Sequence, residues 1–79
     1  MQINELGKII EYHRKRSKLS REELARIASV GKTVVFDLEK GKETIKLSTL
    51  NKIFKVLNIN IVLDSPLMKY YTDQKNEKS

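Results

Sequence analysis

Apolar residues recur at three- and four-residue steps between Asn4 and Lys18, which is the pattern of an amphipathic helix. The expected inward face of this helix consists of Leu6, Ile9, Ile10 and His13. Four cations follow at its end: Arg14, Lys15, Arg16 and Lys18. Cations suit the negative pole of the helix dipole, and they also suit a position near phosphates. The pattern leaves open whether this basic end is simply solvated or lies against an anionic partner.

A second helix is predicted to begin directly after Ser20. The sequence Ser20-Arg21-Glu22-Glu23 is a capping box, in which the Ser20 hydroxyl and the Glu23 carboxylate satisfy two free backbone N–H groups. Its expected inward face consists of Leu24, Ile27 and Ala28. The helix is expected to run to about Ala28, where the short break 29–31 interrupts the pattern.

A third helix is predicted from Lys32 to Lys40. Val35 and Leu38 lie three positions apart and so share one side of it. Gly41 stands where a left-handed residue would end the helix. Two short helices separated by three residues match the helix-turn-helix unit, whose second helix lies in the major groove of DNA.

A fourth helix and a strand are expected to complete the domain. The helix covers residues 48–57, with an apolar stripe of Leu47, Leu50, Ile53, Phe54 and Leu57. Residues 59–63 are rich in β-branched side chains and read as a strand, or alternatively as a frayed fifth helix. A lone strand leaves its backbone groups unpaired, so we expect a second copy to pair with it antiparallel across a two-fold axis. That pairing would bury Ile59, Ile61 and Leu63 in a homodimer interface.

The predicted domain therefore spans residues 1–64, and residues 65–79 form a C-terminal tail. The tail holds an apolar cluster of Leu67, Met68, Tyr70 and Tyr71. Packing of this cluster on the domain, capping of a dimer interface and a role as a docking patch all remain open. Residues 72–79 contain no aliphatic side chain, and we expect them to be disordered.

Composition narrows the class of protein. Seventy-nine residues, 39% hydrophobic and 33% charged, suffice for one small domain with a marginal core, which favours oligomerisation. The absence of cysteine and of a leader-like pattern in residues 1–5 predicts a cytoplasmic protein. The net charge is +6, and all of this excess lies within residues 1–63, which suits a nucleic acid.

Residues 19–41, LSREELARIASVGKTVVFDLEKG, resemble the helix-turn-helix motif of the phage-repressor-like XRE (Cro-type) family. Ala25 matches the small residue at the crossing of the two motif helices, Val35 and Leu38 match inward positions, and Glu39 and Gly41 match an acidic residue and a turn glycine. Ser29 departs from the glycine usual in the turn and would need a positive φ. The resemblance implies an all-α domain of four to five helices.

The same resemblance implies roles for individual residues. Arg14 and Glu39 would form a structural ion pair. The outward residues of the third helix, Lys32, Thr33, Phe36 and Asp37, would contact bases. Lysine can donate to guanine, threonine can bond or touch a thymine methyl group, and aspartate can accept from cytosine, whereas Phe36 could instead be packed. Arg21, Lys40 and Lys42 would contact phosphates or remain solvated surface cations.

Residues 42–63 resemble the HipB antitoxins, in which a fourth helix leads into a C-terminal strand that builds an intermolecular ribbon. This resemblance implies a homodimeric repressor that binds operator DNA, regulates its own operon and neutralises a HipA-like Ser/Thr kinase toxin or a component of a split toxin. The alternative is a stand-alone regulator of the XRE family without a toxin partner.

The sequence lacks the groups of residues that form the common catalytic sites. His13 is the only histidine, cysteine is absent, and no serine lies in a nucleophile elbow or a phosphate-binding loop. His13 also belongs to the inward stripe of the first helix, which favours packing over catalysis or metal binding. The sequence therefore predicts a protein that is not an enzyme, with no cofactor, no metal and no membrane partner.

Overall fold

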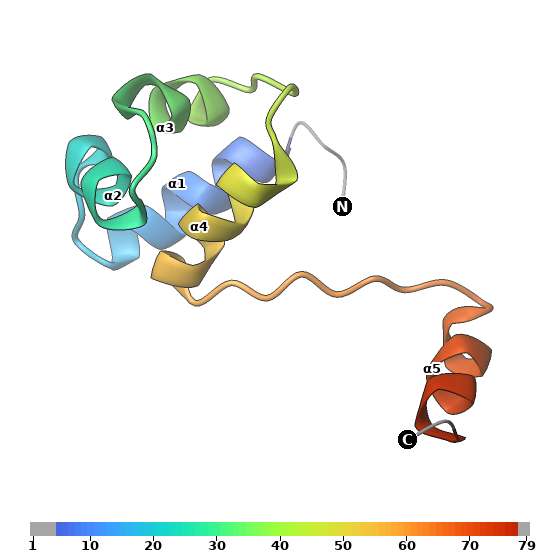
Figure 1. The fold of residues 1–79 in the computed structure, drawn as a ribbon. Helices are drawn as coiled ribbons and strands as arrows, with labels where there is room; N and C mark the ends of the chain where they lie inside the picture. Colours follow the sequence, from blue (N-terminus) through green and yellow to red (C-terminus); the bar gives the residue numbers. More distant parts are fainter. Residues whose placement is uncertain (1–4, 78–79) are drawn as a thin grey trace.

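The computed structural model describes residues 5–77, which form five helices (Figure 1). They are α1 (Leu6–Arg16), α2 (Arg21–Ala28), α3 (Lys32–Glu39), α4 (Leu47–Leu57) and α5 (Met68–Glu77). The first four pack into one helical body, whereas α5 stands apart at the end of an extended segment. The prediction of an all-helical helix-turn-helix fold is confirmed for this part of the chain.

Each of the four packed helices contributes one completely buried side chain to the core. These are Ile10 from α1, Leu24 from α2, Val35 from α3 and Ile53 from α4. The remaining buried apolar residues are Ala25, Ala28, Leu38, Leu50, Phe54 and Leu57. Burial of a large aliphatic side chain contributes about 1.5–3 kcal/mol, so these residues account for much of the driving force that folds the body.

The buried faces of α1 and α2 differ from the predicted ones. Ile27 was expected in the core, but it is 47% exposed, whereas Ala25, which the resemblance placed at the crossing of the two motif helices, is buried. In α1 the buried residues besides Ile10 are Gly7 and Arg14. Gly7 lies directly against the Leu38 backbone of α3, and Arg14 has a buried ionic partner in that helix. Apolar spacing alone does not reveal such a close approach.

The helix ends follow the capping chemistry of the sequence. Ser20 Oγ accepts a hydrogen bond from the Glu23 N–H at 3.0 Å, and a Glu23 carboxylate oxygen accepts one from the Ser20 N–H at 2.9 Å. Gly41 has a φ of +100°, as expected for the left-handed residue after α3. Ser29 adopts the left-handed conformation predicted for it, with φ 57° and ψ 45°. Lys18 and Asn58 also have positive φ.

Residues 59–63 do not form a strand, and the described chain 5–77 contains none. The segment is extended, with the Ile59 N–H bonded to the Phe54 carbonyl at 2.9 Å. Ile59 packs on the core of its own chain rather than standing free for a partner. A strand requires a second strand for its backbone hydrogen bonds, and one copy of the chain supplies none.

The expectation of disorder is wrong for residues 72–77, because these residues belong to α5. Residues 78–79 lie outside the described part of the chain. The predicted start of the first helix at Asn4 also lies outside it. Pro66 precedes the helix, and the Met68 N–H bonds to the Ser65 carbonyl at 3.1 Å. Proline is favoured at helix starts, and no glycine or further proline follows it here. A segment without aliphatic side chains cannot form a hydrophobic core, but it can still form a helix.

Candidate DNA interface

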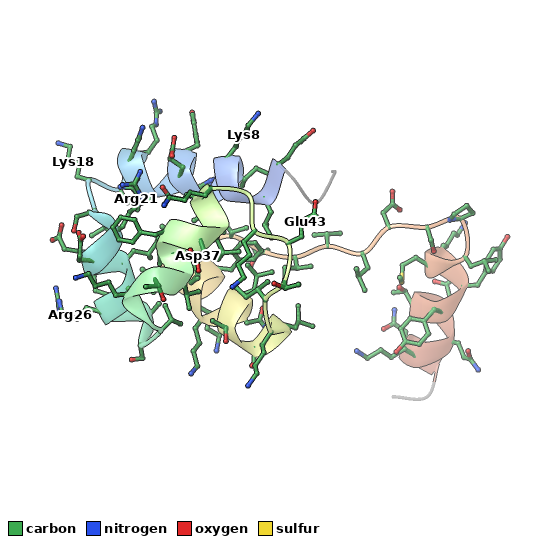
Figure 2. The ribbon with its side chains drawn as sticks, turned by 90° about the horizontal axis from the view of Figure 1, so that it is seen from above. Lys8, Lys18, Arg21, Arg26, Asp37 and Glu43 are labelled. Atoms are coloured by element: carbon green, nitrogen blue, oxygen red, sulfur yellow. The ribbon has the colours of Figure 1, made fainter. Side chains whose placement is uncertain are left out.

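The two helices of the predicted motif are joined by a turn of defined geometry. Ser29 reverses the chain through its left-handed conformation, and the Val30 N–H then bonds to the Ala25 carbonyl at 3.0 Å. Gly31 stands at the N-cap of α3 with an extended backbone. The turn lets Val35 and Leu38 pack on the core, while the opposite side of α3 faces outward (Figure 2).

The four residues predicted to contact bases lie together on this outer side of α3. Lys32 and Thr33 in the first turn are exposed, and Phe36 and Asp37 in the next turn are partly exposed. Positions separated by four residues in a helix share one face, so the four side chains form a single surface. We call this set, Lys32, Thr33, Phe36 and Asp37, the reading face.

Behind the reading face, Arg14 of α1 and Glu39 of α3 form an ion pair, as the resemblance implied. Arg14 Nε donates to Glu39 Oε2 at 2.7 Å, and Nη2 donates to Oε1 at 3.0 Å. Arg14 Nη1 donates to the Leu19 carbonyl oxygen at 2.8 Å. The two side chains are only 7% and 3% exposed. This bidentate pair fixes the end of α3 to α1 and to the turn before α2.

A third residue, Arg21 of α2, joins this pair, and sequence reasoning missed the contact. Arg21 Nε donates to Glu39 Oε1 at 3.1 Å. The Arg21 guanidinium carbon also lies 5.0 Å from the centre of the Phe36 ring, within the range of a cation–π contact. Nothing in the local sequence signals these contacts, because the partners are 18 and 15 residues apart.

The Glu39 carboxylate is held ionised by its partners. Burial acts to raise the pKa of Glu39, but hydrogen bonds and charges from Arg14 and Arg21 outweigh it and lower the pKa below its ordinary value. The pKa of Arg14 is raised, chiefly by its hydrogen bond to Glu39. The site is therefore a buried, charged anchor rather than a titrating centre near neutral pH.

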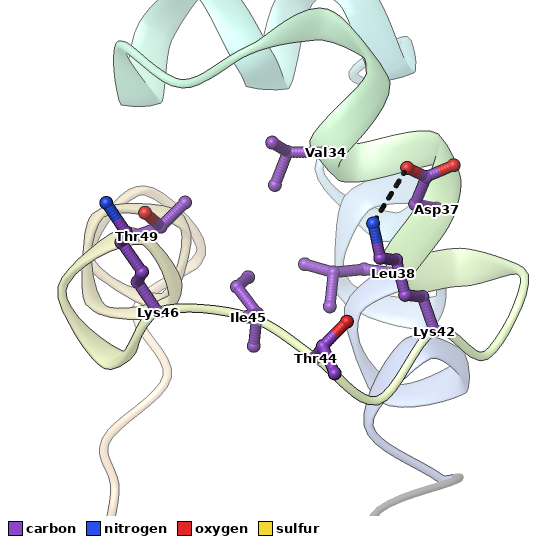
Figure 3. A pocket seen from close by; sticks show the side chains of 8 residues that line it. All are labelled: Val34, Asp37, Leu38, Lys42, Thr44, Ile45, Lys46 and Thr49. Atoms are coloured by element: carbon purple, nitrogen blue, oxygen red, sulfur yellow. Dashed lines mark ion pairs between the residues drawn. The ribbon is translucent and has the colours of Figure 1, made fainter.

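The other predicted phosphate contacts flank α3. Lys40 is exposed directly after α3. Lys42 Nζ lies 3.7 Å from an Asp37 carboxylate oxygen, and both side chains are about half exposed. The pair borders a hollow of about 320 Å³ between α3, the connector and the start of α4, with Thr44, Lys46 and Thr49 on its other sides (Figure 3). The structure thus joins a residue of the reading face to a predicted phosphate contact.

Comparison with known proteins agrees with this arrangement. A family model described as helix-turn-helix matches residues 10–63, more than half of the chain. The chain belongs to the helix-turn-helix family. It is also similar to the uncharacterized HTH-type transcriptional regulator y4mF of Sinorhizobium fredii, with 31% identity over 62 residues, covering 78% of this chain and 82% of that protein.

Other features of this helix-turn-helix chain lie away from the reading face. Ile61 is 47% exposed and Leu63 is 73% exposed, so two of the three predicted dimer residues project from the extended segment.

His13 is partly buried, and its Nδ1 bonds to the Ile9 carbonyl oxygen at 2.7 Å. Within residues 5–77, no group of three or more metal-ligating side chains occurs, and no helix has the length and apolar character needed to cross a membrane.

Proposed function

We propose that this protein is a transcriptional regulator that binds double-stranded DNA sequence-specifically, with α3 in the major groove. The reading face carries the proposal, because its four side chains are turned outward by a helix whose other side is fixed in the core. Lys32 and Thr33 offer a cation and a hydroxyl for base edges, and Asp37 offers an acceptor for cytosine. The net charge of +6 supports binding to a polyanion.

Phosphate contacts would place this face in the groove. Lys40 and Lys42 follow α3 directly, and Arg21 begins α2. Because Arg21 bonds to Glu39, the last residue of α3, all three cations lie near the C-terminal end of the reading face, where the backbone of a duplex lying on α3 would come within their reach. Such contacts set the register and orientation of the protein, whereas the reading face selects the sequence.

A homodimer with one reading face per half-site is the form that we propose for binding. The exposed Ile61 and Leu63 on an extended backbone support pairing of residues 59–63 between two copies, with Ile59 bridging each pair of strands to its own core. A helix-turn-helix dimer binds half-sites about 34–36 Å apart. Ile61→Asp should weaken the dimer in analytical ultracentrifugation, and Val62→Asp, at the alternate position of the extended segment, is the matched control.

The resemblance of residues 42–63 to HipB supports a finer proposal: a repressor of its own operon that also neutralises a HipA-like Ser/Thr kinase or a split-toxin component. The apolar side chains that α5 and its linker leave exposed, including Leu67, Tyr70 and Tyr71, are consistent with a protein partner. Affinity purification of the tagged protein from its native host, followed by mass spectrometry, tests this role. Recovery of a kinase-like protein supports it, and recovery of DNA alone supports a stand-alone regulator.

In vitro selection from a random duplex pool tests DNA binding itself. Wild-type protein should enrich one sequence with two related half-sites. Lys32→Ala combined with Thr33→Ala should abolish binding to that sequence in a band-shift assay while the dimer persists. Lys69→Ala combined with Thr72→Ala removes the same residue types from α5 and should leave affinity unchanged. Failure to enrich any sequence would refute the proposed function.

A further inference from the structure

Phe36 is the unusual member of the reading face, since it is apolar and partly exposed. It does not belong to the set of apolar side chains that pack on the core, although its neighbours in α3, Val34 and Val35, do. A ring outside the core keeps part of its apolar surface in water, and that part adds nothing to the stability of the core. The ring instead packs under a side chain of α2, on the face that we propose for DNA.

The ring is held in place by a chain of contacts that begins in the core. Arg14 holds Glu39 through two hydrogen bonds, and Glu39 accepts a further one from Arg21. The Arg21 guanidinium then lies over the Phe36 ring at 5.0 Å. Glu39 is only 3% exposed and is held by Arg14, so the chain of contacts that reaches the ring through Arg21 starts from a buried, hydrogen-bonded carboxylate.

The chemistry of the major groove indicates what such a ring can read. Among the four bases, only thymine presents an apolar group there, its C5 methyl, and the others present polar donors and acceptors. An aromatic ring fixed on the reading face is thus complementary to thymine and leaves the polar edges of other bases unsatisfied. The ring needs a fixed position because a methyl group offers a small target.

We propose that Arg21 is a positioning residue, which holds the Phe36 ring so that it recognises a thymine methyl group in the operator. This inference rests on the proposed function and assigns one base of the recognised sequence. Arg21 suits this role because its Nε donates to Glu39 while its guanidinium carbon lies 5.0 Å from the ring centre, and a lysine ammonium has no planar group that can both donate and stack. Its outer N–H groups can meanwhile donate to a phosphate, so Arg21 links the DNA backbone to base recognition.

The test uses the duplex that the wild-type protein selects, with each thymine replaced in turn by deoxyuridine, which lacks only the methyl group. At one thymine in each half-site, replacement should weaken wild-type binding about three- to fivefold, the factor for burying one methyl group. Phe36→Ala should bind the thymine and deoxyuridine duplexes equally. Arg21→Lys should keep the cation, and hence the salt dependence of binding, but lose most of the discrimination.

Matched variants separate positioning from general loss of binding. Lys40→Ala should weaken binding and reduce the salt dependence, yet retain the full preference for thymine. Thermal unfolding of each variant checks that the domain is folded, and if Arg21→Lys does not fold, Arg21→Gln and Phe36→Ala decide the question. Full discrimination in either Arg21→Lys or Phe36→Ala would overturn the inference. Because that result requires a selected duplex, it is distinct from failure of the proposed function, in which no sequence is enriched.

Discussion

The backbone of Gly7 in α1 lies directly against the carbonyl group of Leu38 in α3. A Cβ atom at residue 7 would overlap the Leu38 carbonyl oxygen and would lie 3.1 Å from the Cα of Glu39. Backbone atoms cannot rotate aside as the end of a flexible side chain can. Glycine therefore lets α1 approach the end of α3 closely, and this approach brings Arg14 within reach of Glu39.

Gly7→Ala should lower the free energy of unfolding by about 1–3 kcal/mol, the usual cost of overpacking. Chemical denaturation followed by circular dichroism measures the change. Gly31→Ala is the matched control, because the nearest atom to its added Cβ lies 3.5 Å away and its φ is −62°. That control should change stability by less than about 1 kcal/mol. Equal stability of Gly7→Ala and wild type would show that α1 and α3 can separate at little cost.

Glu39 should make the stability of the domain fall in acid. Its pKa is lower in the folded chain than its ordinary value of 4.5, so the unfolded chain takes up the proton first. The contribution of this group is complete well above pH 4.5 and is lost as the pH falls through the lowered value. Glu39→Gln should be less stable near neutral pH and should show a shallower loss in acid. Urea denaturation from pH 7 to pH 3 measures both.

Glu43→Gln serves as the control for that series, since it removes an exposed carboxylate from the connector and leaves the Arg14–Glu39 pair intact. It should follow the wild-type curve. Parallel curves for Glu39→Gln and wild type across the acid range would mean that other carboxylates govern the pH dependence.

Ser29→Gly should stabilise the protein by about 0.5–1 kcal/mol. Serine in the left-handed conformation carries a steric cost of about 1–2 kcal/mol, which glycine avoids, although glycine also gains entropy in the unfolded state. Ser17→Gly is the matched control, because Ser17 ends α1 in the right-handed conformation, with φ −85°. Glycine should give no gain there. Differential scanning calorimetry compares the two variants, and a lower melting temperature for Ser29→Gly would contradict the prediction.

Asp37→Asn should raise affinity for non-specific duplex DNA. Removal of the carboxylate takes a negative charge off the reading face and frees Lys42, whose Nζ lies 3.7 Å from it. A freed cation that neutralises one phosphate makes the slope of log affinity against log salt steeper by about 0.9. Fluorescence anisotropy over a range of salt concentrations measures the slope. Adding Lys42→Gln should remove this increase in slope, and an unchanged slope in Asp37→Asn alone would show that the pair does not restrain Lys42.

Local signals in the sequence predicted the parts of the fold that local chemistry determines. The capping box at Ser20 depends on residues adjacent in the chain, and it is present. The left-handed turn at Ser29 is present too, but the resemblance to the family implied it. The apolar spacing identified the four packed helices, and Val35 and Leu38 were correctly assigned to the core. Pairing of Arg14 with Glu39 was accessible only through resemblance, because the two residues are 25 positions apart.

Features that depend on distances between helices were not predictable in this way. Ile27 fits the apolar stripe of α2, yet it is 47% exposed, and Leu24, Ala25 and Ala28 form the buried face instead. The Arg21 contacts with Glu39 and Phe36 arise only after α2 and α3 are placed together. The strand at residues 59–63 was inferred from composition, and a single chain lacks the second strand that would form its ladder. Helix α5 was not predicted, because residues 72–79 lack the aliphatic side chains whose spacing identifies a packed helix.

The extended segment between α4 and α5 has a consequence for the lifetime of the protein. Residues 60–67 are exposed throughout, and among the described residues no backbone hydrogen bond joins this stretch to the helical body. A protease can therefore bind this segment without waiting for the domain to unfold, so folding stability does not protect it. Cleavage there would remove α5 and leave the helix-turn-helix body whole. The rate at which α5 is lost is thus set by cleavage of the extended segment, and the rate at which the reading face is lost is set by a separate process, unfolding of the helical body.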